Sequence, residues 1–221
     1  MALVRGNTTT YHQIPSGSSL SIAHVQDVGA DGVLIVSMGH TNSNSLDVTG
    51  ITYGGVPMTK RVDRNLTGMS QRLIIYELKN PPTGSNNLVF TWNNSLWNFA
   101  SIQVSSFIGA DIGGNTINVG GSSSPNTKSI NVSEGSAIYT RGVSPGAFSS
   151  IVVAGKSSSG GSLEPNNNNV NSITSGAYSN IGLTAGSYDV VHTSSSNVAI
   201  SAIEIKASSV APTPRRRIHI T

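Results

Sequence analysis

Apolar and polar residues alternate along most of this 221-residue chain, and a period of two residues is typical of β-strands. No segment places apolar residues at i, i+3, i+4 and i+7 over three turns, which is the spacing of an amphipathic helix. In the first half of the chain the alternation predicts seven strands: Ser19–Val25, Val33–His40, Asp47–Tyr53, Met58–Val62, Arg72–Leu78, Asn87–Trp92 and Asn98–Phe107. The pattern therefore predicts an all-β protein.

Turn-forming sequences separate these segments. DVGADG, TNSNS, YGGVP, NPPTGSNN and WNNS stand between successive strands and are rich in Gly, Pro, Asn and Asp. Pro81 and Pro82 have no N–H group, so the segment Asn80–Gly84 is expected to lie outside any central strand. Short strands at this spacing predict an antiparallel β-sandwich, of either the jelly-roll or the immunoglobulin-like type.

The second half of the chain reads like the first. GSNNLVFTWNN of the first half aligns with GSYDVVHTSSS of the second, ASIQV with SAIEI, and DGVLIVSMG with EGSAIYTRG. The three pairs occur in the same order and at nearly the same offset. Such internal similarity predicts a duplicated structural unit.

The chain is accordingly divided into two tandem pseudo-repeats with extended arms at both ends. The expected boundaries are an N-terminal arm at 1–15, a first sandwich at 16–111, a second at 112–208, and a linker with a docking strand at 209–221. The second repeat has the smaller apolar residues, and a unit of about 95 residues supports only one small core. We therefore expect the second repeat to need contact with the first for its stability. One fused sandwich made from both halves is the alternative.

Charge is sparse and local. Charged residues make up 10% of the chain, well below the roughly 25% of ordinary soluble domains. The formal net charge of +3 comes from Arg215, Arg216 and Arg217, because the rest of the chain carries equal numbers of basic and acidic residues. A neutral surface rich in Ser and Asn is common among virion and extracellular β-proteins, and it offers nucleic acid no basic face.

The sequence shows neither targeting signals nor cysteine, which narrows the classes of protein that it fits. The first fifteen residues lack the apolar core of a signal peptide, and no apolar run approaches the roughly 20 residues of a membrane helix. We therefore expect a protein made in the cytoplasm, without a membrane partner. The chain has no cysteine, which excludes disulfides and Cys-ligated zinc.

The residues that could carry chemistry form no recognisable motif. Glu77 and Glu204 lie within strands, where an outward-facing, solvated carboxylate is expected. The histidines are not spaced as metal ligands, and His192 aligns with Phe90, so a packed or half-buried ring is expected there. Nucleotide-binding glycine motifs and the nucleophile elbow are also missing from the sequence. We therefore predict no catalytic residue, no metal site, no cofactor and no enzymatic activity.

Three aromatic residues are candidates for stacking on a sugar ring. Trp97 follows the turn after Trp92, Tyr53 precedes a Gly-Gly pair, and Tyr76 lies in the strand Arg72–Leu78. Exposed on one concave face, they would contact a host surface glycan. Core packing or a rim contact is the interpretation that the sequence favours over a glycan platform.

The chain ends in a segment with an unusual sequence. Pro212 and Pro214 make the preceding linker an extended, semi-rigid spacer. The three arginines offer forked donors for carboxylates or phosphates of a partner, and the alternation of the final residues suits an added strand on a sheet edge of another subunit. The predicted partner-docking residues are Arg215, Arg216, Arg217, Ile218, His219 and Ile220. A frayed terminus is the alternative.

The first repeat resembles a known family. ITYGGVPMTK, RLIIYELKNPPTGSNNLVFTW and ASIQVSSFIGAD are similar to a recurrent β-sandwich module of bacteriophage structural proteins and environmental surface proteins. The second repeat lacks the YGG and PPTG elements. The resemblance implies display and attachment, and it implies no catalytic residues.

These observations favour a non-enzymatic virion structural protein, either a capsid decoration (cement) protein or a fibre- or tail-associated subunit. Its terminal segments would anchor it to major capsid or tail subunits, it would be homo-oligomeric in the particle, and it would assemble in the host cytoplasm. A lectin-like receptor-binding module is the alternative. A polysaccharide-acting enzyme is a third hypothesis, which would need two carboxylates facing each other across a groove.

Overall fold

A computed structural model describes most of the chain, namely residues 3–13, 17–26, 31–41, 47–66, 71–93, 100–119, 125–144, 148–153, 156–157, 174–195 and 198–209. Every regular element among these residues is a β-strand, and all the strand pairings are antiparallel. The predicted all-β fold is thereby confirmed. Within these ranges the structure contains no helix long and apolar enough to cross a membrane.

The first half of the chain forms two sheets, with the strand orders β1-β9-β3-β7-β6 and β2-β8-β4-β5. All seven predicted strands are confirmed, with boundaries moved by a few residues. The strands are β1 (Val4–Gln13), β2 (Ser19–Gln26), β3 (Gly32–Thr41), β4 (Val48–Tyr53), β5 (Val56–Pro57), β6 (Thr59–Leu66), β7 (Gln71–Lys79), β8 (Gly84–Trp92) and β9 (Ala100–Ile108).

The second half forms two further sheets with the same connectivity. In one, β18 pairs with β13, which pairs with β16, while β10 and β11 both pair with the other edge of β18; the other has the order β12-β17-β14-β15. The strands are β10 (Ala110–Asp111), β11 (Thr116–Val119), β12 (Asn126–Val132), β13 (Ser136–Ser144), β14 (Phe148–Val153), β15 (Lys156–Ser157), β16 (Thr174–Leu183), β17 (Gly186–Ser194) and β18 (Ala199–Ala207).

Most strand pairings of the two halves correspond; among the described residues, the β6–β7 and β10–β18 pairings have no counterpart. The order β1-β9-β3-β7 of the first half matches β11-β18-β13-β16 of the second, and β2-β8-β4-β5 matches β12-β17-β14-β15. The burial patterns of β8 and β17 differ at only one of their nine positions. The two halves thus share a strand order, and the duplication itself stays a prediction from the sequence.

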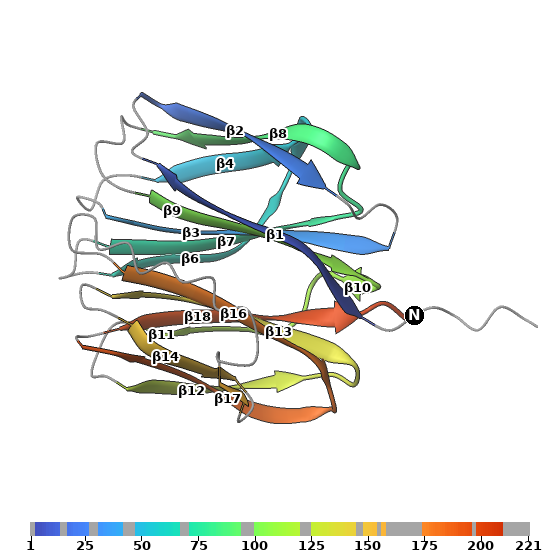
Figure 1. The fold of residues 1–221 in the computed structure, drawn as a ribbon, viewed down its shortest axis with the longest axis vertical. Coiled ribbons are helices and arrows are strands. Elements are labelled where there is room, and N and C mark those ends of the chain that lie inside the picture. The colour runs from blue at the N-terminus through green and yellow to red at the C-terminus, as the bar shows by residue number, and fades with distance from the viewer. Residues whose placement is uncertain are drawn as a thin grey trace, which may run out of the picture.

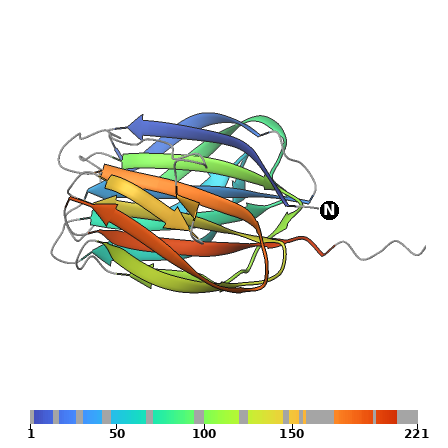
Figure 2. The ribbon, with the colours of Figure 1, turned by 60° about the horizontal axis from the view of Figure 1, so that its bottom comes forward.

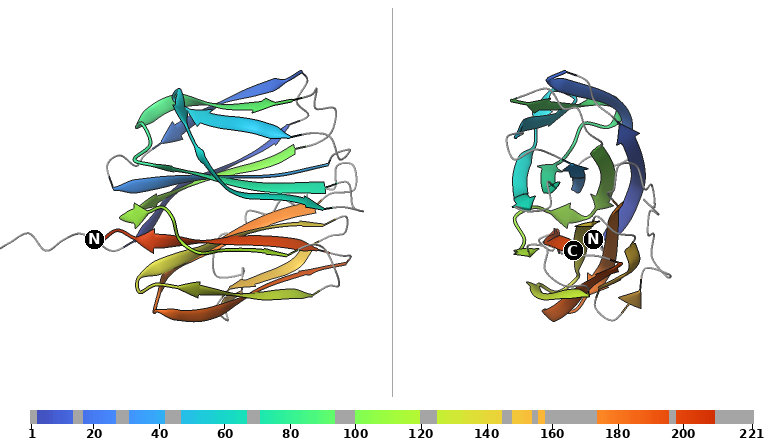
Figure 3. Two further views of the ribbon diagram at one scale, coloured as in Figure 1. Left: turned by 180° about the vertical axis from the view of Figure 1, so that it is seen from behind. Right: turned by 90° about the vertical axis from the view of Figure 1, so that its left-hand side faces the viewer.

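The four sheets stack as four layers (Figure 1). The sheet with β2, β8 and β4 is at one end, the two larger sheets follow, and the sheet with β12, β17 and β14 is at the other end; the view from behind and the end-on view agree (Figure 3). The axes of the strands in all the layers are roughly aligned, with arrows pointing both ways (Figure 2). Two sandwiches are thus stacked face to face.

Three separate hydrophobic cores fill the spaces between the four layers. Alternate residues of one inner strand enter different cores: Leu34 and Val36 of β3 pack in the core of the first sandwich, whereas Val33 and Ile35 pack in a central core between the sandwiches. On the other side of this central core, β13 contributes Tyr139. A third core lies between the two sheets of the second half.

Burial along the strands shows the same arrangement. The inner strands β3, β9, β13 and β18 are buried at nearly every position, as expected for a sheet covered on both faces, whereas β2, β8 and β17 alternate between buried and exposed. Each half therefore keeps its own pair of sheets, and the halves meet through a shared core. A single fused sandwich does not describe this arrangement. The short strand β10, which lies just before the predicted boundary, pairs with β18 of the second half.

The predicted N-terminal arm is wrong for most of its length. Residues 4–13 form β1, which pairs with β9 at the edge of an inner sheet. Its polar residues suit this position because the neighbouring strand is polar too: the Thr8 hydroxyl donates to Ser105 Oγ at 3.3 Å. Tyr11 packs against the first core, and its hydroxyl donates to the Ala23 carbonyl at 2.9 Å.

Candidate functional site

The two tyrosines predicted to contact a glycan are buried. Tyr53 is 0% exposed and Tyr76 is 2% exposed, because both rings lie on the inward side of their strands. The Tyr53 hydroxyl donates to the carbonyls of His24 and Gly84 at 3.1 Å each. Burial raises the pKa of both tyrosines. The expected exposure is therefore wrong for these two rings; the third candidate, Trp97, lies outside the described residues.

The predicted docking segment Arg215–Ile220 also lies outside the described residues. The last residues that the structure describes follow β18, which ends beside β10 in an inner layer, at one side of the stack (Figure 1). Docking through the C-terminal segment therefore stays a prediction.

The two strand glutamates are buried, and the expectation that they face solvent is wrong. Glu77 accepts from Arg61 Nη1 at 2.6 Å and from the Gly113 amide at 3.3 Å. Glu204 accepts from the amides of Asn115 and Ser133 at 3.0 and 2.6 Å. Burial opposes ionisation of Glu204, but these hydrogen bonds outweigh it and lower the pKa of the carboxyl.

Both glutamates hold the segment that joins the two halves. Gly113, Gly114 and Asn115 connect β10 to β11, and Arg61 also donates to the Gly114 carbonyl. A Cβ at Gly114 would lie 2.2 Å from the Glu204 carbonyl oxygen, so only glycine fits this close approach. The residues around each glutamate in the sequence do not indicate this arrangement. The amides of Gly113 and Asn115, which bind the two carboxylates, belong to a connection that is far from both glutamates along the chain.

A fully buried arginine links the sandwiches inside the central core. Arg141 of β13 donates to the Ser101 carbonyl at 3.0 Å, to Ser101 Oγ at 2.8 Å and to Gln103 Oε1 at 3.2 Å. Burial lowers its pKa to about 10, so it stays charged at neutral pH. Nearby, Ser37 Oγ and the Tyr139 hydroxyl are 2.6 Å apart, which adds a second polar contact between the halves.

The prediction that His192 is packed is confirmed. Its ring is 0% exposed, and its Nε2 lies 2.9 Å from Thr140 Oγ1. Burial lowers the pKa of His192 to about 3, and the positive charge of Arg141 adds to this effect. In the part of the chain that the structure describes, no group of three or more His, Asp or Glu residues is placed to hold a metal ion.

A network of four charged residues lies beside the first core. Lys60 Nζ and Arg72 Nε contact the Asp63 carboxylate at 2.7 and 2.6 Å, and Arg72 Nη2 contacts Asp47 at 2.8 Å. Burial raises the pKa of Asp63, but the bonds from Arg72 and Lys60 outweigh it and lower the pKa below its usual value. Opposite charges are matched throughout, which is typical of a structural contact.

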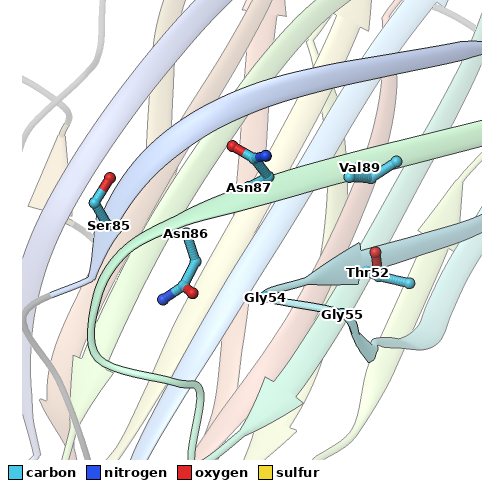
Figure 4. A pocket seen from close by; sticks show the side chains of 7 residues that line it. All are labelled: Thr52, Gly54, Gly55, Ser85, Asn86, Asn87 and Val89. Carbon is cyan, nitrogen blue, oxygen red and sulfur yellow. The ribbon is translucent and has the colours of Figure 1, made fainter.

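A hollow of about 480 Å³ lies on the outer sheet of the first sandwich. It is formed where the turn between β4 and β5 meets the start of β8 (Figure 4). These are the YGG and TGSNN sequences that carry the family resemblance. We call it the Gly54 hollow; its lining residues are Thr52, Gly54, Gly55, Ser85, Asn86, Asn87 and Val89.

Comparison with models of known protein families gives no match, and comparison with curated proteins gives none either.

Proposed function

We propose that this chain is a non-enzymatic structural protein of a virus particle, either a capsid decoration protein or a fibre- or tail-associated subunit. The observation that carries the proposal is the position of three buried charged side chains, which link the two sandwiches. Glu77, Glu204 and Arg141 hold the connection between the sandwiches or the core they share. Buried charges are costly unless they are well paired, and here they contribute to holding two sandwiches together as one stack.

The outer face of the first sandwich supports a display role. Among the described residues of β2, β4 and β8, every outward-facing side chain is uncharged and small. These residues are Ser19, Ser21, Ala23, Val25, Thr49, Thr52, Ser85, Asn87, Val89 and Thr91. A neutral polar sheet of this kind is suited to facing solvent on the outside of a particle, where strong fields of one sign would attract unrelated partners.

Anchoring to the particle is assigned to the terminal segments. Arg215–Arg217 would contact acidic groups of major capsid or tail subunits, and Ile218–Ile220 would add a strand to an edge of a neighbouring subunit. The protein would then be present as symmetric copies in the virion, assembled in the host cytoplasm. Of the two locations, a decoration protein is favoured because the chain lacks the heptads of a fibre shaft.

The test is the amount of this chain in purified particles. We expect the full-length chain at a fixed copy number per particle by quantitative mass spectrometry. A variant lacking Arg215–Thr221 should stay folded but should no longer sediment with particles, and a variant with Arg215–Arg217 changed to Ser should be intermediate. Absence of the chain from washed particles would refute the proposal, and undiminished association of the deletion variant would refute the anchoring mechanism.

A further inference from the structure

The Gly54 hollow owes its shape to two glycines. Gly54 and Gly55 have φ angles of +56° and +80°, which favour glycine, and they turn the chain from β4 into β5 without side chains. A Cβ at Gly54 would lie 3.1 Å from Asn86 Oδ1, whereas a Cβ at Gly55 would point into open space. A ligand can therefore approach the backbone of the turn closely at Gly55.

The start of β8 supplies polar side chains on two sides of the strand. Asn86 lies toward the Gly54 turn, while Ser85 and Asn87 leave the strand on the other side (Figure 4). Asn86 Nδ2 is held by the Thr83 carbonyl at 3.1 Å. Within the described part of the chain, no protein group bonds to the side chains of Ser85, Asn87 or Thr52, so their hydrogen-bonding capacity is open to a ligand.

The chemistry of the lining suits a neutral ligand with several hydroxyl groups. All seven lining residues are uncharged, so a charged ligand would lose hydration without gaining a counter-charge. An amide and a hydroxyl each donate and accept, which matches the paired donors and acceptors of vicinal sugar hydroxyls. The Val89 methyl groups offer a small apolar contact for the CH groups of a ring. The volume lies within the range of small-molecule sites, about 300–1,000 Å³.

The second sandwich has different residues at the equivalent place. Asn86 and Asn87 correspond to Tyr188 and Asp189, both two or three residues after the first Gly of the strand. These two side chains already have partners: the Tyr188 hydroxyl lies 2.7 Å from Thr184 Oγ1, and Asp189 accepts from Ser129 Oγ at 2.6 Å. Val152 takes the place of Thr52, because each pairs with the corresponding valine of its neighbouring strand. The open Asn87 amide and Thr52 hydroxyl are therefore specific to the first sandwich, whereas Ser85 has a serine counterpart, Ser187.

We propose that the Gly54 hollow is a binding site for neutral saccharides, which it holds through the Asn87 amide, the Ser85 and Thr52 hydroxyls and the exposed backbone of the glycine turn. It needs none of the three aromatic residues that the sequence suggested. Because the site is open to solvent and holds few polar groups, a single copy binds in the millimolar range. Many copies on one surface would raise the apparent affinity through multivalency. The site does not depend on the anchoring of the chain to a particle.

The test uses the full chain, labelled with ¹⁵N, and NMR titration. The probes are neutral disaccharides of glucose, galactose, mannose and N-acetylglucosamine at up to about 50 mM, above the expected millimolar dissociation constant. We expect saturable shifts of the backbone amides of residues 54–55 and 85–87 and of the Asn87 side-chain amide with at least one probe. Unsaturated or absent shifts with every probe would overturn the proposal.

Matched variants localise the effect. Asn87→Asp and Thr52→Val introduce the residues of the second sandwich, and each should weaken binding about fivefold, the size of one lost hydrogen bond. Asn131→Asp makes the same change at an exposed position of β12 and should leave binding unchanged. The spectra of the variants report whether each one is folded. Equal binding by the Asn87→Asp variant, shifts centred elsewhere, or binding of acidic saccharides alone would contradict the assignment.

Discussion

The two sandwiches share one strand order but fill it with different side chains. The core of the first contains Phe90 and Trp92, and the equivalent strand of the second places His192 where Phe90 stands. Ile51 pairs with Phe90 in the first half, and Ile151 pairs with His192 in the second. The same topology therefore tolerates a large apolar ring in one copy and a hydrogen-bonded polar ring in the other.

The difference in core size between the two sandwiches is a reason for the halves to be stacked rather than separate. The second sandwich has the smaller core, and the inner face of its β13 and β18 sheet is covered by the first sandwich. A small core supplies little stability by itself, so burial of a second face compensates. We infer that the central core couples the unfolding of the two halves.

The largest effect is expected from breaking the central core. Ile75 of β7 is fully buried there, and Ile75→Asp would place an unpaired carboxylate among apolar side chains. We expect a loss of about 5 kcal/mol or more of unfolding free energy. Val25→Asp is the control, because Val25 is 60% exposed on the outer sheet and its substitution should cost less than about 0.5 kcal/mol.

Denaturant titration followed by NMR signals from both halves checks this prediction. If the central core couples the sandwiches, signals from both halves disappear together in Ile75→Asp. Retention of a native second half while the first unfolds would contradict the coupling.

A smaller effect should separate the two equivalent core positions. Phe90→Ala removes a fully buried ring and leaves a cavity, which typically costs about 3–5 kcal/mol. His192→Ala removes a smaller ring and leaves the Thr140 hydroxyl without one of its partners, which should cost about 1–3 kcal/mol. Denaturant midpoints of the two variants measure the difference. Equal losses would show that the two cores depend equally on ring volume.

Much of the fold follows from the sequence because the outer strands alternate cleanly. β2 and β8 show apolar residues on one side and Ser, Thr or Asn on the other, which is the pattern of a sheet with one wet face. The four-layer stack was not predicted. The apolar run Val33–Val36 carries the signal, since a strand covered on both faces reads as a continuous apolar segment. The aligned run in β13, Ser136–Tyr139, begins with a serine and is followed by Thr140 and Arg141, so the pattern is hidden there.

The candidate site was harder to predict than the fold. The YGG and TGSNN sequences predict turns, but nothing in the sequence shows that β4 and β8 are neighbours in one sheet. Likewise, the contacts of Glu77 and Glu204 with residues 113–115 depend on where the connection between the halves passes. The burial of Tyr53 and Tyr76 agrees with the core packing that the sequence favours, and it removes both rings as glycan contacts.

Acid should reveal a further difference between the halves. The folded pKa of His192 is about 3, below the roughly 6.5 of an unfolded histidine, so the unfolded chain binds an extra proton between these values. Stability from neutral His192 is therefore fully present above about pH 6.5 and is lost progressively as the pH falls toward 3. The carboxyls of Asp63 and Glu204 have lowered folded pKa values, so their contributions are lost only below about pH 4.

A variant that cannot titrate isolates the histidine. His192→Gln can keep a hydrogen bond to Thr140 without taking up a proton. The difference in unfolding free energy between the variant and the parent chain should change by about 3 kcal/mol from pH 7 to pH 4, in favour of the variant at low pH. Denaturant titrations at several pH values measure it. A pH-independent difference would show that the ring is accessible to protons in the folded state.

The smallest effect is expected at an exposed contact near the junction of the halves. Lys79 Nζ lies 2.8 Å from Asp111 Oδ1, with side chains 44% and 37% exposed, whereas the Arg61–Glu77 pair is nearly buried. The hydrogen bond from Lys79 is the largest cause of the lowered pKa of Asp111. Water screens such an exposed pair, so Lys79→Ala should change the unfolding free energy by no more than about 0.5 kcal/mol, and the change should vanish near about 1 M salt. Denaturant titration at low and high salt measures it. A loss of several kcal/mol that persists at high salt would mean that this pair, and not the central core, holds the sandwiches together.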